Sequence, residues 1–240
     1  DMMKRVVKAN ERFVPPYGTG ASLYIRPLLL GTSAQVGVNP SQEYLLLMFV
    51  TPVGPYYKEG FNPIKVMIDR DHDRAAPLGT GHVKVGGNYA ASLTSGEIGH
   101  EKGYPCVLYL DAKEKKHIDE CGGANFFGIR QGTYITPRSH SVLPSITNKS
   151  LMTLAEELGL KVEQRIVDYE ELATFEEAGA CGTAAVISPI GSIYDPSNDR
   201  TFVYGDGTKA GPNCEKLYHR LRAIQYGEEP DTYGWMVEVK

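Results

Sequence analysis

The sequence lacks the features that mark several common classes of protein. Its four cysteines form no CxxC pair and none lies near a histidine at zinc-finger spacing, which argues against a disulfide framework or a zinc site. No run of Lys or Arg could neutralise a phosphate backbone, and the net charge is −4, so we do not expect nucleic acid as a partner. The longest apolar runs, such as residues 44–50, are far shorter than the roughly 20 residues that cross a bilayer. No charged and then apolar signal segment opens the chain. These absences predict a cytoplasmic protein without a metal site.

The composition is that of a globular protein. Of the 240 residues, 42% are hydrophobic and 22% are charged, which is enough apolar material for one large core or two modest ones. Strand patterns appear at residues 21–31 and 44–50, and a stretch rich in proline, glycine and tyrosine follows at 51–63. Such a change of composition is typical of a connector between domains, so we place a boundary near Asn62.

Beyond this boundary, strand and helix patterns follow one another, which predicts a mixed α/β (α+β) domain. The predicted strands are 64–69, 106–110, segments within 117–129, 133–136, 161–167 and 184–193. The predicted helices are 88–102, a helix from Thr147 to Gly159, 169–177 and 213–226.

A glycine-rich stretch around one lysine, GTGHVKVGGNY at residues 79–89, is the most unusual segment. It is not a P-loop, because that motif needs glycine before its lysine and Ser or Thr after it, whereas Val83 and Val85 flank Lys84. A lysine held in a turn walled by glycine and apolar groups can lose hydration, which favours the neutral amine that attacks a carbonyl. Lys84 is therefore a candidate Schiff-base nucleophile. A surface lysine in a flexible loop is the alternative that composition alone favours.

An acidic run at residues 69–73 resembles the opening of a calcium-binding loop. That loop would need glycine at its sixth position and glutamate at its twelfth, where this sequence has Arg74 and Thr80. The pattern therefore favours a solvated charged turn.

Thr147 lies where the N-cap of the predicted helix should be. The N–H groups that follow a cap point beyond the helix and favour a phosphate or a carboxylate. Because most capping threonines only cap, an anion site here is a hypothesis.

Glu120 lies between apolar residues in a predicted strand, so its carboxylate needs a buried cationic partner. A structural salt bridge and a protonated pyridine nitrogen both remain open as that partner. On an earlier predicted strand, Tyr24 and Arg26 project from one face. Arg26 could bind a carboxylate there through two hydrogen bonds, or it could simply face water.

Seven segments, taken in order, resemble the branched-chain amino-acid aminotransferases, pyridoxal-phosphate enzymes of fold type IV. They are SLYIRP at 22–27, PVGPYY at 52–57, KVGGNY at 84–89, IDECGGANFF at 118–127, LPSIT at 143–147, CGTAA at 181–185 and IQYG at 224–227. The resemblance implies an α/β fold in which residues 1–62 are the remainder of a small domain with the interdomain connector. Residues 63–240 would be a large, mixed-sheet, barrel-like domain that binds pyridoxal 5'-phosphate. It also implies a homodimer.

In this family the lysine of the KVGGNY motif, here Lys84, binds the cofactor as a Schiff base and moves the proton at the substrate's Cα. The resemblance implies that Tyr89 hydrogen-bonds the cofactor's phenolic oxygen and that Glu120 pairs with its pyridine nitrogen, which makes the ring an electron sink. Ile146 and Thr147 match the turn whose N–H groups hold the phosphate.

The remaining site residues follow from the same resemblance. Thr183 matches a hydroxyl that joins the phosphate site, and Thr183 and Ala184 match the pair whose amides receive the substrate carboxylate. Tyr24 and Arg26 match residues on the substrate side, where Arg26 would meet the second carboxylate of glutamate. The implied reaction moves the amino group of L-leucine, L-isoleucine or L-valine to 2-oxoglutarate in two half-reactions, a ping-pong scheme.

One departure from the family pattern concerns the phosphate. The family's small domain supplies an arginine to the phosphate from a segment upstream of SLYIRP, and neither Arg5 nor Arg12 lies in such a context. We therefore expect this segment to be missing from the chain. Two alternatives remain: another fold type IV activity, such as D-amino-acid transamination or aminodeoxychorismate lyase chemistry, or a non-catalytic fragment that binds the cofactor.

Overall fold

The computed structural model describes residues 1–54 and 61–240. The chain divides into two units: Asp1–Lys58 together with Tyr233–Lys240, and Glu59–Thr232. The predicted boundary near Asn62 lies four residues beyond the end of the first segment, and the C-terminal segment belongs to the first unit and not to the rest of 63–240. The assignment of 1–62 and 63–240 to a small and a large domain stays a prediction. Part of the predicted connector and of the PVGPYY segment, residues 55–60, lies outside the described residues.

The first unit is built on a long β-hairpin. Strand β1 (Ser22–Gly31) pairs antiparallel with β2 (Tyr44–Val53), and helices α1 (Met2–Ala9) and η1 (Glu11–Phe13) precede them. Both predicted strands are confirmed, but β2 continues three residues past the predicted end at residue 50. The cause is the register: the first three residues of β1 pair with residues 51–53, so the start of the predicted connector is held in the ladder.

The second unit is built on one large mixed sheet. Its strands are β3 (Ile64–Asp69), β4 (Cys106–Leu110), β5 (Ile118–Cys121), β6 (Asn125–Arg130), β7 (Thr133–Pro137), β8 (Lys161–Arg165), β9 (Glu177–Gly182), β10 (Val186–Asp195) and β11 (Arg200–Val203). Within the described residues, the pairing runs β10, β3, β4, β5, β6, β9 and back to β10, which closes a barrel of six strands. The predicted mixed α/β, barrel-like fold is confirmed.

Strand β9 escaped prediction because its residues are small. Its sequence, EAGACG, has little of the β-branched and aromatic content that signals a strand. A Cβ at Gly179 would lie 2.7 Å from Cε1 of Phe127 on the neighbouring strand β6. Likewise, a Cβ at Gly128 would lie 2.5 Å from Cδ1 of Phe175. Small residues are thus required where large aromatic rings fill the barrel.

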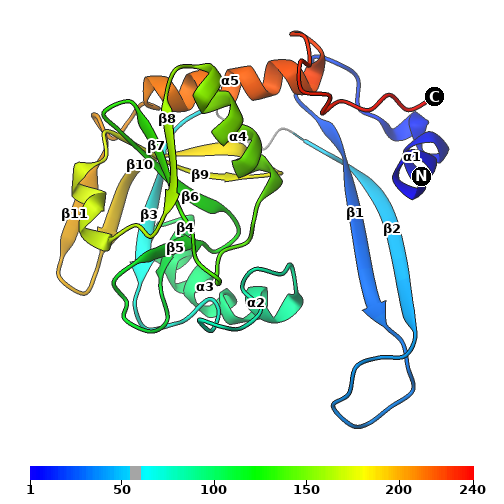
Figure 1. The fold of residues 1–240 in the computed structure, drawn as a ribbon, viewed down its shortest axis with the longest axis horizontal. Coiled ribbons are helices and arrows are strands. Elements are labelled where there is room, and N and C mark those ends of the chain that lie inside the picture. Colours follow the sequence, from blue (N-terminus) through cyan, green and yellow to red (C-terminus); the bar gives the residue numbers. More distant parts are fainter. Residues whose placement is uncertain (55–60) are drawn as a thin grey trace. The chain divides into compact units, whose positions relative to one another are not determined.

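Helices cover parts of this sheet (Figure 1). They are α2 (Gly86–Ala91), α3 (Leu93–Glu101), α4 (Ile146–Glu157), η2 (Tyr169–Thr174) and α5 (Pro212–Tyr226). Helices α4 and α5 contact each other and strand β9, whereas α3 contacts β4. The helix predicted at 88–102 is in fact two helices, because Ser92 donates its hydroxyl to the carbonyl of Tyr89 and interrupts the regular pattern. No helix of the described residues has the length and apolar character needed to cross a membrane.

Candidate active site

The loop that carries Lys84 is fixed by an asparagine of the helix that follows it. Asn88, in α2, donates from Nδ2 to the carbonyls of Thr80 (2.7 Å) and Val83 (2.8 Å). The hydroxyl of Thr80 in turn donates to Asn88 Oδ1 at 3.0 Å. Asn88 is only 6% exposed, so these bonds are shielded from water. The backbone just before Lys84 therefore has one well-defined path.

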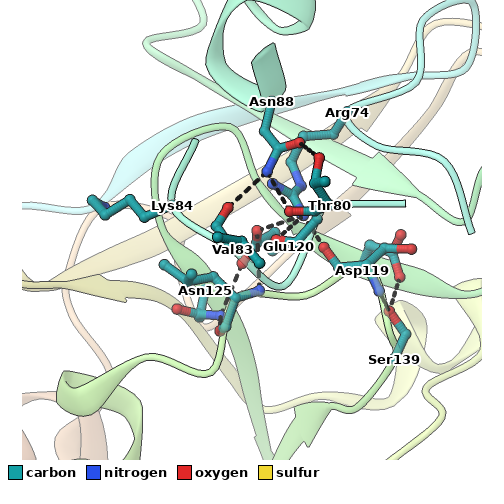
Figure 2. Close-up of polar contacts among 12 residues, drawn as sticks. Arg74, Thr80, Val83, Lys84, Asn88, Asp119, Glu120, Asn125 and Ser139 are labelled. Atoms are coloured by element: carbon teal, nitrogen blue, oxygen red, sulfur yellow. Dashed lines mark hydrogen bonds and ion pairs between the residues drawn. The ribbon is translucent and has the colours of Figure 1, made fainter. Parts of the chain in front are cut away.

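The amine of Lys84 lies beside a phenol. Lys84 Nζ donates to Tyr89 Oη at 2.9 Å, and it lies 5.3 Å from the centre of the tyrosine ring. The lysine side chain points away from the polar cluster around Glu120 (Figure 2) and is exposed. We expected the glycine-rich loop to shield this lysine from water, but the loop alone does not do so. Helix α2, which follows the loop, does provide a phenol oxygen that accepts a hydrogen bond from the amine.

Glu120 lies on β5, as predicted, and is 4% exposed. Its Oε1 is 2.9 Å from Nη2 of Arg74, and its Oε2 accepts from Nδ2 of Asn125 at 2.9 Å. The N–H of Leu143 approaches Oε1 at 3.5 Å. Burial raises the pKa of Glu120 to about 7, although the cation of Arg74 acts in the opposite direction. The carboxyl therefore releases its proton more readily when a further cation lies beside it.

The helix that was expected to begin at a Thr147 cap begins earlier. The N-cap of α4 is Ser145, whose hydroxyl accepts from the N–H of Asn148 at 3.2 Å. The prediction of Thr147 as the cap was wrong, because a serine two residues upstream already has the extended backbone that a cap needs. Ile146 and Thr147 are instead the first two residues of the helix, and their N–H groups have no partner within a helix. Both remain available for an anion.

Thr183 and Ala184 lie in the turn that joins β9 to β10. The turn leads into Val186, whose φ is +64°. A β-branched residue with positive φ is a strained outlier, and such strain is often kept at functional positions. Thr183 and Ala184 are exposed, so their polar groups can reach a ligand.

Tyr24 and Arg26 lie on β1, in the other unit. The guanidinium carbon of Arg26 is 5.0 Å from the centre of the Tyr24 ring, so the prediction that the two share one strand face is confirmed. Both residues belong to the first unit, whereas Lys84 and Glu120 belong to the second.

The acidic run at residues 69–73 is a charged turn whose Asp71 and Asp73 are exposed, as predicted, but its first residue is buried. Asp69 is 7% exposed and accepts from the N–H groups of Asp71 and His72. Asp73 pairs with Lys115. Within residues 1–54 and 61–240, no group of three or more His, Cys, Asp or Glu side chains is placed to hold a metal ion.

Three residues of this region were missed by sequence reasoning: Arg74, Asn88 and Asn125. All three are buried and polar, and each acts on a site residue and not on solvent. Asn88 and Asn125 lie inside motifs that had been noted, KVGGNY and IDECGGANFF, but no pattern assigns them a contact. Arg74 was hidden in the charged run that precedes the glycine-rich loop.

The barrel unit thus offers three chemical functions. Lys84 supplies an amine that can attack an aldehyde, Glu120 supplies an acid that can face a cationic ring atom, and the start of α4 supplies N–H groups for an anion. Gly86 and Gly87 add open space, because a Cβ at either position would meet nothing within 4 Å. This set fits a ligand that combines an aldehyde, a basic aromatic nitrogen and a phosphate.

Comparison with known families and sequences gives a consistent result. The family Amino-transferase class IV matches residues 1–193. The chain is 47% identical to a branched-chain-amino-acid aminotransferase of Haemophilus influenzae, over 99% of this chain and 70% of that protein. It is 48% identical to a protein of the same name from Helicobacter pylori, over 98% of this chain and 68% of that protein.

Solved structures have the same fold. The branched-chain amino acid aminotransferase of Escherichia coli superposes with a TM-score of 0.81 at 30% identity, over 99% of this chain and 74% of that one. An enzyme of the same name from T.th., solved with pyridoxamine 5'-phosphate, superposes with a TM-score of 0.84 at 27% identity, over 99% of this chain and 73% of that one. A second structure of the T.th. enzyme contains N-(5'-phosphopyridoxyl)-L-glutamate and gives a TM-score of 0.80 at 28% identity, over 99% of this chain and 73% of that one.

Proposed function

Because the chain belongs to the class IV aminotransferases, we propose that it is a branched-chain-amino-acid aminotransferase, which moves the amino group of L-leucine, L-isoleucine or L-valine to 2-oxoglutarate. The observation that carries this proposal is the 47% identity, over 99% of the chain, to the Haemophilus influenzae enzyme. The resemblance of the site motifs adds a ping-pong order, in which the 2-oxo acid formed from the first amino acid leaves before 2-oxoglutarate reacts.

Pyridoxal 5'-phosphate is the cofactor that fits these residues. The T.th. relative was solved with pyridoxamine 5'-phosphate, which has the phosphate and the ring nitrogen that the barrel unit can receive. When bound, the cofactor supplies an aldehyde for the amino group and a ring that accepts electrons. Lys84 would hold it through its amine, Glu120 through the ring nitrogen, and Ile146 and Thr147 through the phosphate.

The roles of the chain's own side chains follow from the contacts. The Lys84 amine, when it does not hold the cofactor, would be the base that takes the proton from the substrate's Cα. The same amine would deliver this proton to C4′ of the cofactor. The hydroxyl of Tyr89, 2.9 Å from this amine, orients it and stabilises its charged form by a hydrogen bond. Asn88 keeps the loop in place while the proton moves. The buried carboxylate of Glu120 holds a proton on the ring nitrogen, because an anion in a site of low polarity strongly favours a neighbouring cation.

Two pairs of residues would bind the substrate, one at its carboxylate and one at its side chain. Thr183 and Ala184 would bind the carboxylate that all amino acids share, through the amides of their turn. Tyr24 and Arg26 would line the side-chain pocket, where the Arg26 guanidinium meets the second carboxylate of glutamate. The methylene carbons of arginine and the tyrosine ring can also contact an aliphatic side chain, which lets one pocket accept both substrate types.

A comparison of substrates tests the proposal. The purified protein, saturated with pyridoxal phosphate, is assayed with L-leucine and 2-oxoglutarate, with D-alanine, and with aminodeoxychorismate. We expect turnover of L-leucine only, abolished by Lys84→Ala and retained by the matched control Lys113→Ala, which alters an exposed lysine. Faster reaction of either other substrate would assign a different fold type IV activity. A cofactor spectrum that no amino acid changes would indicate a non-catalytic protein.

The assembly and location are part of the same proposal. We expect a homodimer in the cytoplasm, on the grounds of the family resemblance. Sedimentation equilibrium of the purified protein tests the first expectation, and fractionation of the cells that produce it tests the second.

A further inference from the structure

Arg74 is assigned no part in the proposed reaction, yet it contacts Glu120 of the proposed cofactor site. It lies between the end of β3 and the glycine-rich loop, and it is 7% exposed. Its Nη2 is 2.9 Å from Oε1 of Glu120 and 3.2 Å from the carbonyl oxygen of Gly81, and it also donates to the carbonyl of Ser141. Figure 2 shows the guanidinium of Arg74 directed at Glu120.

These contacts join the three segments that would bind the cofactor. Gly81 belongs to the loop that leads to Lys84, Glu120 lies on β5, and Ser141 precedes the first turn of α4. The loop and the Ser141 segment touch so closely that a Cβ at Gly81 would lie 2.7 Å from Cα of Ser141. One guanidinium therefore sets the spacing between the amine, the acid and the anion-binding turn.

Stability alone does not account for this ion pair. A buried ion pair is on average no more stabilising than well-packed apolar residues, because both charges lose their hydration. Here the hydrogen bonding is also incomplete, since Nε of Arg74 is buried and donates to no partner among the described residues. Leaving such a donor unpaired costs about 1–3 kcal/mol. A functional role of the pair would account for an arginine at this position in spite of this cost.

The proposed role of Arg74 concerns the ionisation and the orientation of the Glu120 carboxyl. The charged or polar groups that contact its carboxyl are Arg74, Asn125 and the N–H of Leu143, and the charges of Asp119 and Lys84 act on it at longer range. Burial favours the neutral acid, and among these groups the cation of Arg74 opposes burial most strongly. Without that cation, the pKa of the Glu120 carboxyl would rise further, and the carboxyl would ionise less readily beside a ring nitrogen.

We propose that Arg74 is the positioning residue of the site: it holds the Glu120 carboxyl in one orientation beside its own cation, and it ties that carboxyl to the loop of Lys84. The inference rests on the proposed function, because it concerns how the acid that faces the cofactor is prepared. Arg74 itself touches no reacting atom.

The titration of Glu120 tests this role directly. Cofactor-free protein with ¹³C-labelled glutamate is titrated by NMR, and the Glu120 carboxyl signal is assigned with Glu120→Gln. In Arg74→Met we expect the titration midpoint of Glu120 to move to higher pH, and pyridoxal phosphate to bind roughly tenfold more weakly. The matched control is Arg200→Met, which alters an arginine on the edge strand β11 that is paired with the exposed Glu170 and should leave both values unchanged.

A second variant keeps the test decisive if Arg74→Met does not fold. Arg74→Lys retains the cation but cannot reach several acceptors at once, so we expect a smaller rise in the Glu120 midpoint and cofactor binding that is weaker by roughly threefold. A Glu120 midpoint and a cofactor affinity that equal those of the wild type in the folded variant would overturn the proposal. If the wild type binds no pyridoxal phosphate, the proposed function fails instead, whereas the titration still reports on Arg74.

Discussion

Replacing Glu120 by glutamine should remove a specific dependence of stability on pH from the cofactor-free protein. The carboxyl is 4% exposed, and burial raises its pKa from the usual 4.5 to about 7, with the cation of Arg74 acting against burial. The folded state therefore holds this proton more tightly than the unfolded chain does. The stabilisation is complete at pH values below the ordinary pKa of the carboxyl, and it is lost as the pH rises through the raised value.

The size of the effect follows from the two pKa values. The pKa of the carboxyl is 4.5 in the unfolded chain and about 7 in the folded protein. Each pKa unit of difference between the two states corresponds to about 1.4 kcal/mol. The free energy of unfolding of the wild type should therefore fall by about 3 kcal/mol relative to Glu120→Gln between about pH 4.5 and pH 8. Other groups that titrate in this range affect both proteins and cancel in the difference.

Urea unfolding of both proteins at a series of pH values measures this difference. Asp119→Asn is the matched control: Asp119 is the neighbouring buried acid, and burial raises its pKa against the hydrogen bond from Ser139. Because the Asp119 charge also raises the pKa of Glu120, its removal should reduce the Glu120 component but not abolish it. Curves for the wild type and Glu120→Gln that stay parallel across the whole range would refute the reasoning.

Three further substitutions have defined outcomes. Tyr89→Phe removes the hydroxyl that lies 2.9 Å from Nζ of Lys84, so transamination should slow roughly tenfold with the fold unchanged by circular dichroism; an unchanged rate would show that this hydrogen bond does not orient the amine for catalysis. Gly81→Ala would drive a methyl group against the backbone of Ser141, so stability measured in urea should fall by about 2 kcal/mol and cofactor binding should weaken. Unaltered stability would contradict the close approach of the two segments. Glu177→Ala leaves the N–H groups at the start of α5 without their buried acceptor, so thermal unfolding should report a loss of about 2 kcal/mol while the rate per folded molecule stays the same; a large drop in that rate would show that the contact between Glu177 and α5 affects the site.

The sequence predicts most elements of this fold because most of them follow the hydrophobic period of their class. Strands such as β3 and β4 are short apolar runs, and their predicted bounds agree with the structure. Elements whose residues are chosen by packing were not predictable. Strand β9 is made of small residues because Phe127 lies against it, and the barrel it closes depends on pairings between segments far apart in the chain.

Some residues of the candidate site could be predicted from the sequence, and others could not. Lys84 could be selected because a lysine inside a glycine-rich loop is unusual in itself, and the motif resemblance gave it a role. Arg74 could not be selected, because its position in a charged run suggests a solvated turn and its partner Glu120 lies 46 residues away in the sequence. The cap of α4 was misplaced for a local reason: Ser145 and Thr147 are both good caps, and only the backbone conformation decides between them.

Identification of the residue that binds the cofactor covalently is the most direct test of the central claim. The protein is saturated with pyridoxal phosphate, reduced with borohydride and digested, and the labelled peptide is sequenced by mass spectrometry. We predict that the label lies on Lys84, in the peptide that contains VKVGGNY, and that Lys84→Ala takes up none. A label on any other lysine, or equal labelling of the Lys84→Ala variant, would contradict the proposed site.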